Sequence, residues 1–461
     1  MFEKLNYLDF NEAINKSFEL TNTTLSSEFV SINFAINRVV SEDILCVKNL
    51  PAFDNSAMDG FAFKASDAGQ TLKIKRAIFA GDKDKSSDEL LEKNECYKIM
   101  TGAKVPKDAD TIIAIENCLD VTEDSVTIPA DIKKGSNLRL EAEELKKGDI
   151  LIKKGEKINS SHIALLASQG VVMVEVYKQI SIAVLSTGNE LKEPWQKASN
   201  EEIYNCNSFA IIAQLNEKGF NATYCGVIPD NLEKSINFIN SLKKYDVIIT
   251  SGGISMGDAD FMAEAFLKNG LEVAFHGVNV KPGRPIMMGK MDSSLVICLP
   301  GNPLTAMVNI NLFVIPMLKK LQGENAFYHG YIKAINQSSF KTKKGRVNLV
   351  LGRVQNGNFY VTDNNNYGSG MITAFYKSNS ILVTNASTSN IQSEQEVTFG
   401  QDGNYRDIVD YLNKSKAMMQ SFNEVERLYK AEVATYGQRN ISFENEHDYE
   451  NLDNARDSDL L

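Results

Sequence analysis

Residues 245–261 restrict the possible folds of this chain more than any other stretch. Val247-Ile248-Ile249 is a short apolar run, typical of a strand that is buried on both faces. A polar, glycine-rich segment from Thr250 to Gly257 follows it, and Asp258 then begins an amphipathic helix that ends at Gly270. A buried strand joined to a helix by such a loop is half of a βαβ unit, so the stretch predicts a parallel sheet covered by helices.

The same loop is a candidate binding site. Its glycine and serine residues leave backbone N–H groups free to hold an anion beside a helix N-terminus. The residues are Ser251, Gly252, Gly253 and Ser255. Asp258 and Asp260 stand at that helix start, and carboxylates next to an anion usually require a metal ion between them. An ordinary βα turn with Asp258 as the helix cap explains the same residues, and the loop alone does not separate the two interpretations.

Residues 179–322 repeat this alternation of strands and helices, which predicts a doubly wound α/β domain. We expect strands at 180–185, 223–227, 247–249 and 295–299, and helices from Asn207 or Ser208 to Gly219, over 231–243 and over 303–321. A polar loop follows each strand, and loops after parallel strands gather at one edge of the sheet. The loop residues that we expect to meet there are Ser186, Thr187, Gly188, Asp230, Ser251, Gly252, Gly253, Pro300, Gly301 and Asn302.

The N-terminal part has a different texture. Asp9 and Glu12 predict a helix with a capping box at its start, and a second helical pattern covers 31–40. Residues 62–135 are rich in strands, expected at 71–80, 95–100 and 111–115. Asp59-Gly60 lies in a loop that mixes turn formers with bulky apolar residues; it is either a simple turn or part of a cleft. Thr101 at a strand end is a weak anion-binding signal, and Arg139 lies in a charged cluster more typical of a solvated surface. A helix over 161–168 and a strand over 171–177 precede the doubly wound domain.

The C-terminal part is again rich in strands, expected around 330–335, 347–354, 359–361, 381–383 and 396–399, with Gly368-Ser369-Gly370 in a loop. Beyond residue 401, apolar residues recur at helical spacing over 418–436, which predicts one amphipathic helix. The acidic, apolar-poor residues after Gly437 are typical of a disordered tail.

Bulk properties exclude several classes of protein. A chain of 461 residues is expected to hold about three domains, and a net charge of −10 argues against a nucleic-acid binder. There is no signal-peptide core, and no apolar run approaches the roughly 18 residues of a membrane span, so we expect a cytoplasmic protein. The six cysteines are scattered and there are only four histidines, so oxygen ligands are expected for any metal.

These motifs together resemble the molybdopterin molybdenumtransferase family, which includes the E domain of gephyrin. Six motifs occur in order at compatible spacing: Pro51-Ala-Phe-Asp-Asn-Ser-Ala-Met-Asp59-Gly60, Met100-Thr101-Gly102-Ala103, Ser186-Thr187-Gly188-Asn189-Glu190-Leu191, Ser251-Gly252-Gly253-Ile-Ser255-Met-Gly257-Asp258-Ala-Asp260, Lys281-Pro282-Gly283-Arg284-Pro285 and Leu299-Pro300-Gly301-Asn302-Pro303. The resemblance implies insertion of molybdate into adenylylated molybdopterin with release of AMP, with magnesium (Mg²⁺) or zinc present.

The resemblance also implies an architecture. It is an α/β multidomain fold with an extended linker domain (1–30 and 136–178), a β-rich domain (31–135), the doubly wound molybdopterin-binding domain (179–325) and a C-terminal β-barrel (326–400). The extension 401–461 has no counterpart in the family pattern. Members of the family are homodimers, and each site lies between the doubly wound domain of one subunit and the N-terminal part of the other. Contact with the molybdopterin adenylyltransferase and other proteins of cofactor synthesis is a further expectation.

Roles for individual residues follow from the resemblance together with their chemistry. The residues expected to carry catalysis are Asp59, Thr101, Glu190, Asp230, Asp260 and Lys281, with Asp59 and Thr101 supplied by the partner subunit. Magnesium is expected on Glu190, Asp230, Asp258 and Asp260. The residues expected to bind substrate are Arg139, Ser186, Thr187, Gly188, Ser251, Gly252, Gly253, Ser255, Asp258, Arg284, Pro300, Gly301, Asn302 and Ser369.

Some positions depart from the family pattern. Asn189 and Asn205 stand where the family usually has Asp, Glu144 replaces Asp, and Gly277 replaces a Lys or Arg. Two alternatives to the molybdenumtransferase follow. One is the related single-domain adenylyltransferase, against which the 178 N-terminal residues count; the other is a non-catalytic scaffold of the same fold, for which the 401–461 extension counts.

Overall fold

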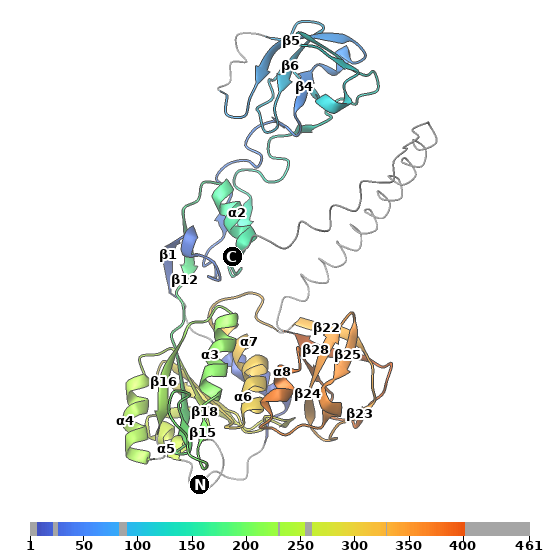
Figure 1. The fold of residues 1–461 in the computed structure, drawn as a ribbon. Coiled ribbons are helices and arrows are strands. Elements are labelled where there is room, and N and C mark those ends of the chain that lie inside the picture. The colour runs from blue at the N-terminus through green and yellow to red at the C-terminus, as the bar shows by residue number, and fades with distance from the viewer. Residues whose placement is uncertain are drawn as a thin grey trace.

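The computed structural model describes residues 7–21, 26–82, 90–228, 231–253, 261–328 and 330–401. Four predicted site residues, Asp230, Ser255, Asp258 and Asp260, lie outside these ranges, as do the predicted helix over 418–436 and the acidic tail. The described chain is elongated: a β-rich sheet lies at one end, and the doubly wound domain and a second β domain lie together at the other (Figure 1).

The doubly wound domain is built on a six-stranded sheet, in the order β16-β13-β17-β21-β20-β18. The first four strands are parallel to one another, and β20 runs antiparallel to both of its neighbours, β21 and β18. The strands are β13 (Ile182–Thr187), β16 (Ala222–Ile228), β17 (Val247–Ser251), β18 (Leu271–His276), β20 (Met287–Met291) and β21 (Ser294–Leu299). The predicted strands are confirmed, whereas β18 and β20 were not predicted from the sequence.

Helices cover both faces of this sheet (Figure 1). Alternate residues of β17 enter two different cores: Ile249 packs with residues of α3, α6 and α7, and Ile248 packs with residues of α4 and α5. The helices are α3 (Asn207–Glu217), α4 (Leu232–Leu242), α5 (Phe261–Lys268), α6 (Pro303–Asn309) and α7 (Ile315–Leu321). Burial on both faces explains why the strand sequences are apolar throughout, and the prediction of a doubly wound domain is confirmed.

Three details of these helices differ from expectation. The residue before α3 is Cys206, without a side-chain cap, and Asn207 is the first helical residue rather than the cap. The predicted helix over 303–321 is one continuous element, but Ile310–Val314 forms a π turn between α6 and α7. Pro303–Leu321 is long and apolar enough to cross a membrane, contrary to our reading of the sequence, yet 78% of the tested window is buried inside the fold, as in a core helix.

The β-rich unit is a six-stranded sheet in the order β7-β4-β6-β5-β9-β8. The strands are β4 (Gly60–Phe63), β5 (Thr71–Ile78), β6 (Glu95–Ile99), β7 (Thr111–Ala114), β8 (Asp120–Val121) and β9 (Ser125–Thr127). The first residue of β4, Gly60, has to be a glycine, because a Cβ atom there would lie 1.8 Å from the carbonyl oxygen of Ile113 on the neighbouring strand. Asp59 therefore stands directly before a strand whose backbone approaches β7 closely.

A small unit joins the two ends of the molecule. Its strands pair across long sequence separations: β1 (Ser27–Ser31) with β12 (Met173–Tyr177), and β2 (Ile44–Leu45) with β11 (Ile150–Ile152). Helix α2 (Ser160–Ser168) has a capping box in which Asn159 accepts from the backbone of His162 and His162 accepts in return.

The helix predicted over 31–40 is wrong. Only Ile32–Phe34 forms a short 3₁₀ turn, Asn37 has a positive φ of 64°, and Val39 and Val40 lie in isolated β-bridges. Tertiary pairing overrides the apolar spacing here, because the left-handed backbone at Asn37 cannot continue a helix. Ala35, Val40 and Cys46 pack with Leu151 and Val174, so packing favours a boundary of the β-rich unit nearer residue 50 than residue 31.

The N-terminal helix α1 (Phe10–Glu19) packs on the doubly wound domain. Asp9 caps it by accepting from the N–H of Asn11 at 2.9 Å, so the predicted cap is confirmed but the predicted capping box with Glu12 is not formed. The Phe10 ring meets Phe313 edge-on at 5.5 Å, and Ala13 lies in the core shared with α6 and α7. Its packing therefore places α1 with the doubly wound domain rather than with the linker.

The C-terminal β domain closes on itself. Strand β24 pairs with β25, β25 with β22, β22 with β28, β28 with β26, and β26 again with β24. The strands are β22 (Gly330–Asn336), β24 (Val347–Gln355), β25 (Asn358–Val361), β26 (Ser380–Val383) and β28 (Glu396–Gln401). A short strand from the doubly wound domain, β19 (Val280–Lys281), pairs in parallel with β24 and thus ties the two domains together.

Candidate active site

Three strand-end loops of the doubly wound domain converge at the carboxyl edge of its sheet. The Gly252 N–H donates to the Leu299 carbonyl at 3.0 Å, and the Ser251 hydroxyl donates to the Pro300 carbonyl at 3.2 Å. A Cβ atom on Gly301 would lie 3.6 Å from the Gly252 Cα. The loops after β13, β17 and β21 therefore form one continuous surface, as parallel strands require.

Glycine is required at two positions of this surface. Gly252 and Gly253 have positive φ values of 94° and 66°. A Cβ on Gly252 would lie 2.9 Å from the Thr187 carbonyl oxygen, and one on Gly253 would lie 2.8 Å from the Thr187 hydroxyl. Left-handed backbone and close approach thus both exclude a side chain.

Ser186 lies behind the site surface. It is 1% exposed and its hydroxyl contacts the Ser208 hydroxyl at 2.7 Å and Asn205 Oδ1 at 3.1 Å. Asn205 in turn donates to the Tyr224 hydroxyl at 2.9 Å, and that hydroxyl donates to Glu193. Burial, followed by the Glu193 carboxylate, raises the pKa of Tyr224, so the phenol stays protonated. These groups hold one another, so the Ser186 hydroxyl is buried and bonded within the fold.

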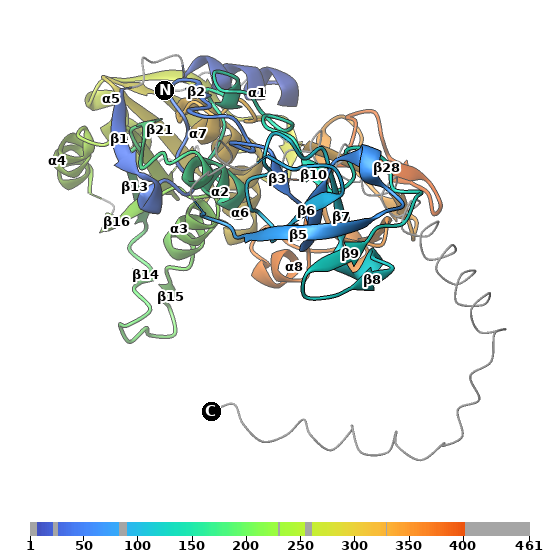
Figure 2. The same cartoon turned by 90° about the horizontal axis from the view of Figure 1, so that it is seen from above.

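Beta strands β14 (Leu191–Lys192) and β15 (Ile203–Tyr204) form a small parallel pair that projects from the doubly wound domain (Figure 2). The loop before β14 carries Glu190, which is exposed. Its carboxylate lies close to Gly188, since a Cβ there would be 2.6 Å from Glu190 Oε2. Glu190 therefore stands at the surface next to the Thr187-Gly188 turn.

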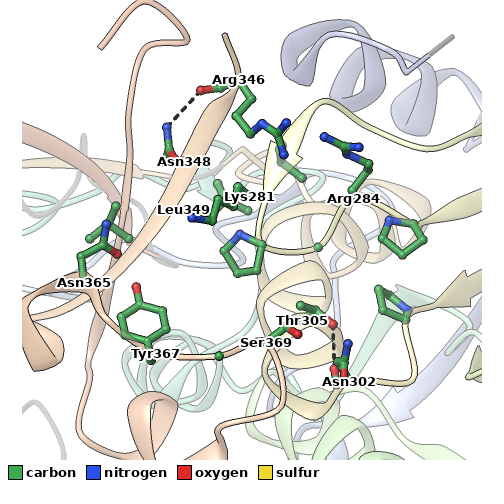
Figure 3. A pocket seen from close by; sticks show the side chains of 17 residues that line it. Lys281, Arg284, Asn302, Thr305, Arg346, Asn348, Leu349, Asn365, Tyr367 and Ser369 are labelled. Carbon is green, nitrogen blue, oxygen red and sulfur yellow. Dashed lines mark hydrogen bonds between the residues drawn. The ribbon is translucent and has the colours of Figure 1, made fainter. Parts of the chain in front are cut away.

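A pocket of about 420 Å³ lies between this domain and the C-terminal β domain (Figure 3). Segments 280–285, 300–305, 346–350 and 365–369 line it. The predicted residues that it brings together are Lys281, Arg284, Pro300, Asn302 and Ser369. Ser369 and Lys281 thus line the same pocket although they belong to different domains.

Three cationic side chains line the pocket, Lys281, Arg284 and Arg346, and none of its described lining residues is acidic. The sequence reasoning missed Arg346. Its only local signal is the basic segment Lys341-Thr-Lys-Lys-Gly-Arg346. The pairing of β19 with β24, which places Lys281 opposite Asn348, brings that segment to the pocket.

Neighbouring groups orient the polar lining. The Arg284 guanidinium lies 4.4 Å from the centre of the Tyr7 ring, and backbone hydrogen bonds of Leu8 with Gly277 and Asn279 hold this N-terminal segment in place. Burial raises the pKa of Tyr367 to about 12, so its hydroxyl, which accepts from the Leu351 N–H at 2.7 Å, keeps a proton to donate. The pocket therefore presents cations and donors, a composition that suits an oxyanion.

Asp59, Thr101 and Arg139 lie elsewhere. The Asp59 carboxylate accepts from the Thr101 N–H and from its hydroxyl, each at 2.7 Å, and these bonds, the backbone one foremost, lower the pKa of Asp59. Arg139 lies in β10 (Leu138–Arg139), paired with Asn55 of β3 (Asn55–Ser56). All three are exposed in the β-rich unit, which in Figure 1 lies at the far end of the chain from the pocket. One chain by itself does not bring them to Lys281.

The predicted metal site is represented by one ligand in the described part of the chain, Glu190. Asp230, Asp258 and Asp260 lie outside it, and the described residues hold no group of three or more His, Cys, Asp or Glu that could bind a metal.

Of the positions that depart from the family pattern, Asn205 is built into the buried Ser186 network. Gly277 acts through its backbone, donating to Ile286 and accepting from Leu8.

Comparison with known proteins matches most of the described chain to one family. Three family models match in order: "MoeA N-terminal region (domain I and II)" at residues 8–170, "Probable molybdopterin binding domain" at 183–320, and "MoeA C-terminal region (domain IV)" at 333–400. The molybdopterin molybdenumtransferase of Haemophilus influenzae is 33% identical over 400 residues, which cover 85% of this chain and 98% of the relative. The chain belongs to the MoeA family.

Other MoeA relatives agree. The molybdopterin molybdenumtransferase of Staphylococcus aureus is 33% identical over 346 residues, covering 73% of this chain and 81% of that protein. The crystal structure of a molybdopterin biosynthesis MoeA protein from Pyrococcus horikoshii is 25% identical, with a TM-score of 0.75 over 86% of this chain and all of that one. The multidomain α/β fold of this MoeA-family chain is thereby confirmed.

Proposed function

We propose that the chain is a molybdopterin molybdenumtransferase, which inserts molybdate into adenylylated molybdopterin and releases AMP. The observation that carries the proposal is the pocket lined by Lys281, Arg284 and Arg346 without a carboxylate among its described lining residues. Both molybdate and an adenylyl phosphate are oxyanions, and guanidinium forks match their geometry. Membership of the MoeA family supports the same reaction.

The residues act by positioning and charge compensation. Lys281, Arg284 and Arg346 offset the charge of molybdate, while Ser369 and the protonated Tyr367 supply hydrogen-bond donors. The Ser251–Gly253 loop and the turn at Pro300–Asn302 form the adjoining wall, where we place the adenylyl end. Molybdenum prefers the soft sulfur atoms of the pterin dithiolene, so no protein thiolate is needed, and no cysteine is among the described residues that line the pocket.

We assign the second half of the site to a partner subunit. Asp59 is held ionised by Thr101, both are exposed, and they lie at the opposite end of the chain from Lys281. A homodimer in which the β-rich unit of one subunit reaches the doubly wound domain of the other would unite them. Arg139, on the strand paired with Asn55, would arrive with them.

A divalent cation, magnesium or zinc, belongs to the proposal. Glu190 is the described carboxylate at the sheet edge, and we assign Asp230, Asp258 and Asp260 to the same ion. A cation there would relieve repulsion between these carboxylates and the phosphate. We therefore expect activity to be lost in excess chelator and restored by adding back magnesium or zinc.

The reaction is tested with the purified full-length chain, adenylylated molybdopterin and molybdate. We expect AMP release that depends on molybdate and transfer of molybdenum to the pterin. Lys281→Ala and Arg284→Ala should each raise the KM for molybdate at least roughly tenfold, because each removes a charged partner of the anion. Absence of AMP release with either metal present would refute the proposal.

Two further expectations concern the surroundings of the enzyme. We place it in the cytoplasm, and we expect contact with the molybdopterin adenylyltransferase, whose product is its substrate. Co-purification of the two proteins from cell extract, compared with a chain lacking residues 402–461, tests that contact.

A further inference from the structure

We infer that Asn207 is a positioning residue for this reaction: its side-chain amide holds two strand-end loops together and so sets one wall of the substrate pocket. The inference rests on the proposed function, which assigns molybdate to the pocket, while the contacts of Asn207 are observed in the structure. Asn207 does not line the pocket.

The contacts of Asn207 cross between loops. Its Nδ2 group donates to the Ser251 hydroxyl at 2.7 Å and to the Gly301 carbonyl at 2.8 Å. The Ser251 hydroxyl then donates to the Pro300 carbonyl at 3.2 Å. One amide thus connects the loop after β17 with the loop after β21.

These bonds are not part of the helix that Asn207 begins. The residue before the helix is Cys206, whose side chain does not cap it, and the Ser208 N–H of the first turn donates to Asn205 Oδ1 at 3.3 Å. A capping asparagine, one residue earlier in the chain, would accept from the first turn through its side-chain oxygen, and Asn207 lies past that position. Here both amide hydrogens point instead to the neighbouring loops.

The loops that Asn207 joins lead directly to the pocket. Pro300 and Asn302, on either side of Gly301, line it, and α6 starts at Pro303 (Figure 3). Thr305, one turn into that helix, also lines the pocket and donates to the Asn302 carbonyl at 2.7 Å. A shift of Gly301 would therefore move Asn302 and the first turn of α6 relative to Lys281.

The substitution Asn207→Asp tests whether Asn207 positions the pocket wall independently of its effect on the stability of the fold. Aspartate has the same size, but its carboxylate donates no hydrogen bond and would face the Gly301 carbonyl oxygen. A negative charge in the first turn of a helix is favourable to the fold, because it interacts with the helix dipole. The substitution should therefore weaken the binding of molybdate in the pocket without lowering the melting temperature.

The experiment compares the full-length wild type with Asn207→Asp and with Asn216→Asp, an exposed residue of the same helix that receives the same charge. The readouts are the Kd of molybdate by calorimetry, the KM and kcat of AMP release, and the melting temperature. For Asn207→Asp we expect the Kd and KM for molybdate to rise roughly tenfold or more, with a smaller change in kcat and no loss of Tm. Asn216→Asp should leave Kd and KM unchanged.

Three results bear against the inference or the reaction. Equal Kd values for the two variants would overturn the inference, and so would a fall in Tm that accompanies the loss of binding. If wild type bound molybdate but released no AMP, the proposed reaction would fail, and the Kd comparison would still decide the role of Asn207.

Discussion

At the scale of single residues, the pair Asp59 and Thr101 shows how two hydrogen bonds keep an exposed carboxylate ionised. The Thr101 N–H and hydroxyl both donate to one carboxylate oxygen, and both bonds favour its ionised form. The pKa of Asp59 is therefore below its ordinary value of 3.8, with the backbone bond as the larger cause. Since a depressed pKa stabilises the fold only above the unfolded value, this contribution is lost as the pH falls below 3.8.

The pair yields a titration test. Thr101→Val removes the hydroxyl and keeps the backbone N–H, so the pKa of Asp59 should rise but remain below 3.8. NMR titration of the Asp59 carboxyl carbon measures it, with Asp54, which accepts from the Glu141 N–H, as an internal reference. A pKa unchanged by the substitution would show that the hydroxyl bond is absent in solution.

Gly252 makes a second prediction at this scale. Gly252→Ala places a Cβ 2.9 Å from the Thr187 carbonyl at a φ of 94°, whereas Gly270→Ala meets the same kind of strain, φ 89°, in open space. We expect Gly270→Ala to lower the free energy of unfolding by about 1 kcal/mol from backbone strain alone. Gly252→Ala should lower it by about 2 kcal/mol or more, because the backbone contact adds to the strain.

Denaturant unfolding of both variants checks this difference. Equal losses for the two glycines would mean that the Thr187 contact relaxes freely. Activity should fall for Gly252→Ala only, because Gly270 ends α5 away from the converging loops.

At the scale of elements, the short strand β19 and the turn before β24 build half of the pocket. Asn348 is 3% exposed and organises that turn: its Oδ1 accepts from the Lys343 N–H and its Nδ2 donates to the Lys343 and Arg346 carbonyls, all at 3.0 Å. The Arg346 bond is drawn in Figure 3. The turn therefore holds the backbone of Arg346, whose side chain lines the pocket.

Asn348→Ala should disrupt this element. It leaves the buried backbone groups of the turn without partners, so we expect a loss of about 1–3 kcal/mol in the free energy of unfolding. Displacement of Arg346 should also raise the KM for molybdate. Asn358→Ala in β25, outside the pocket, serves as the control; if both variants had the same KM, the turn would not position Arg346.

At the scale of the whole molecule, the chain separates two groups of site residues along its length. Lys281 and Arg346 lie between the doubly wound and C-terminal domains, and Asp59 lies in the β-rich unit (Figure 1). A shared site between two subunits predicts complementation. At a molybdate concentration below the wild-type KM, Asp59→Asn and Lys281→Ala should each retain about a tenth of the wild-type rate or less when assayed alone.

Refolded or co-expressed as an equal mixture, the two variants should recover about a quarter of wild-type activity, because half of the dimers are mixed and each holds one intact site. The assay is AMP release, with each variant alone as the control. No recovery from a mixture shown to contain mixed dimers would mean that both groups act within one chain, or that they do not act together.

The sequence by itself determined the local elements and the family. Apolar strands such as Val247–Ser251, the Asp9 cap and the strand-end glycines depend on neighbours within a few residues, and local spacing records such interactions. It also predicted that Ser251 and Pro300 would meet, because parallel strands end at one edge.

Only the tertiary structure decided how distant segments combine. Arg346 joined Lys281 through the pairing of β19 with β24, the pattern over 31–40 became β-bridges instead of a helix, and Ser186 turned inward to Asn205. Each outcome depends on contacts between residues far apart in the chain, whose partners no local pattern specifies. For that reason the sequence predicted most walls of the pocket, while the fold supplied its third cation.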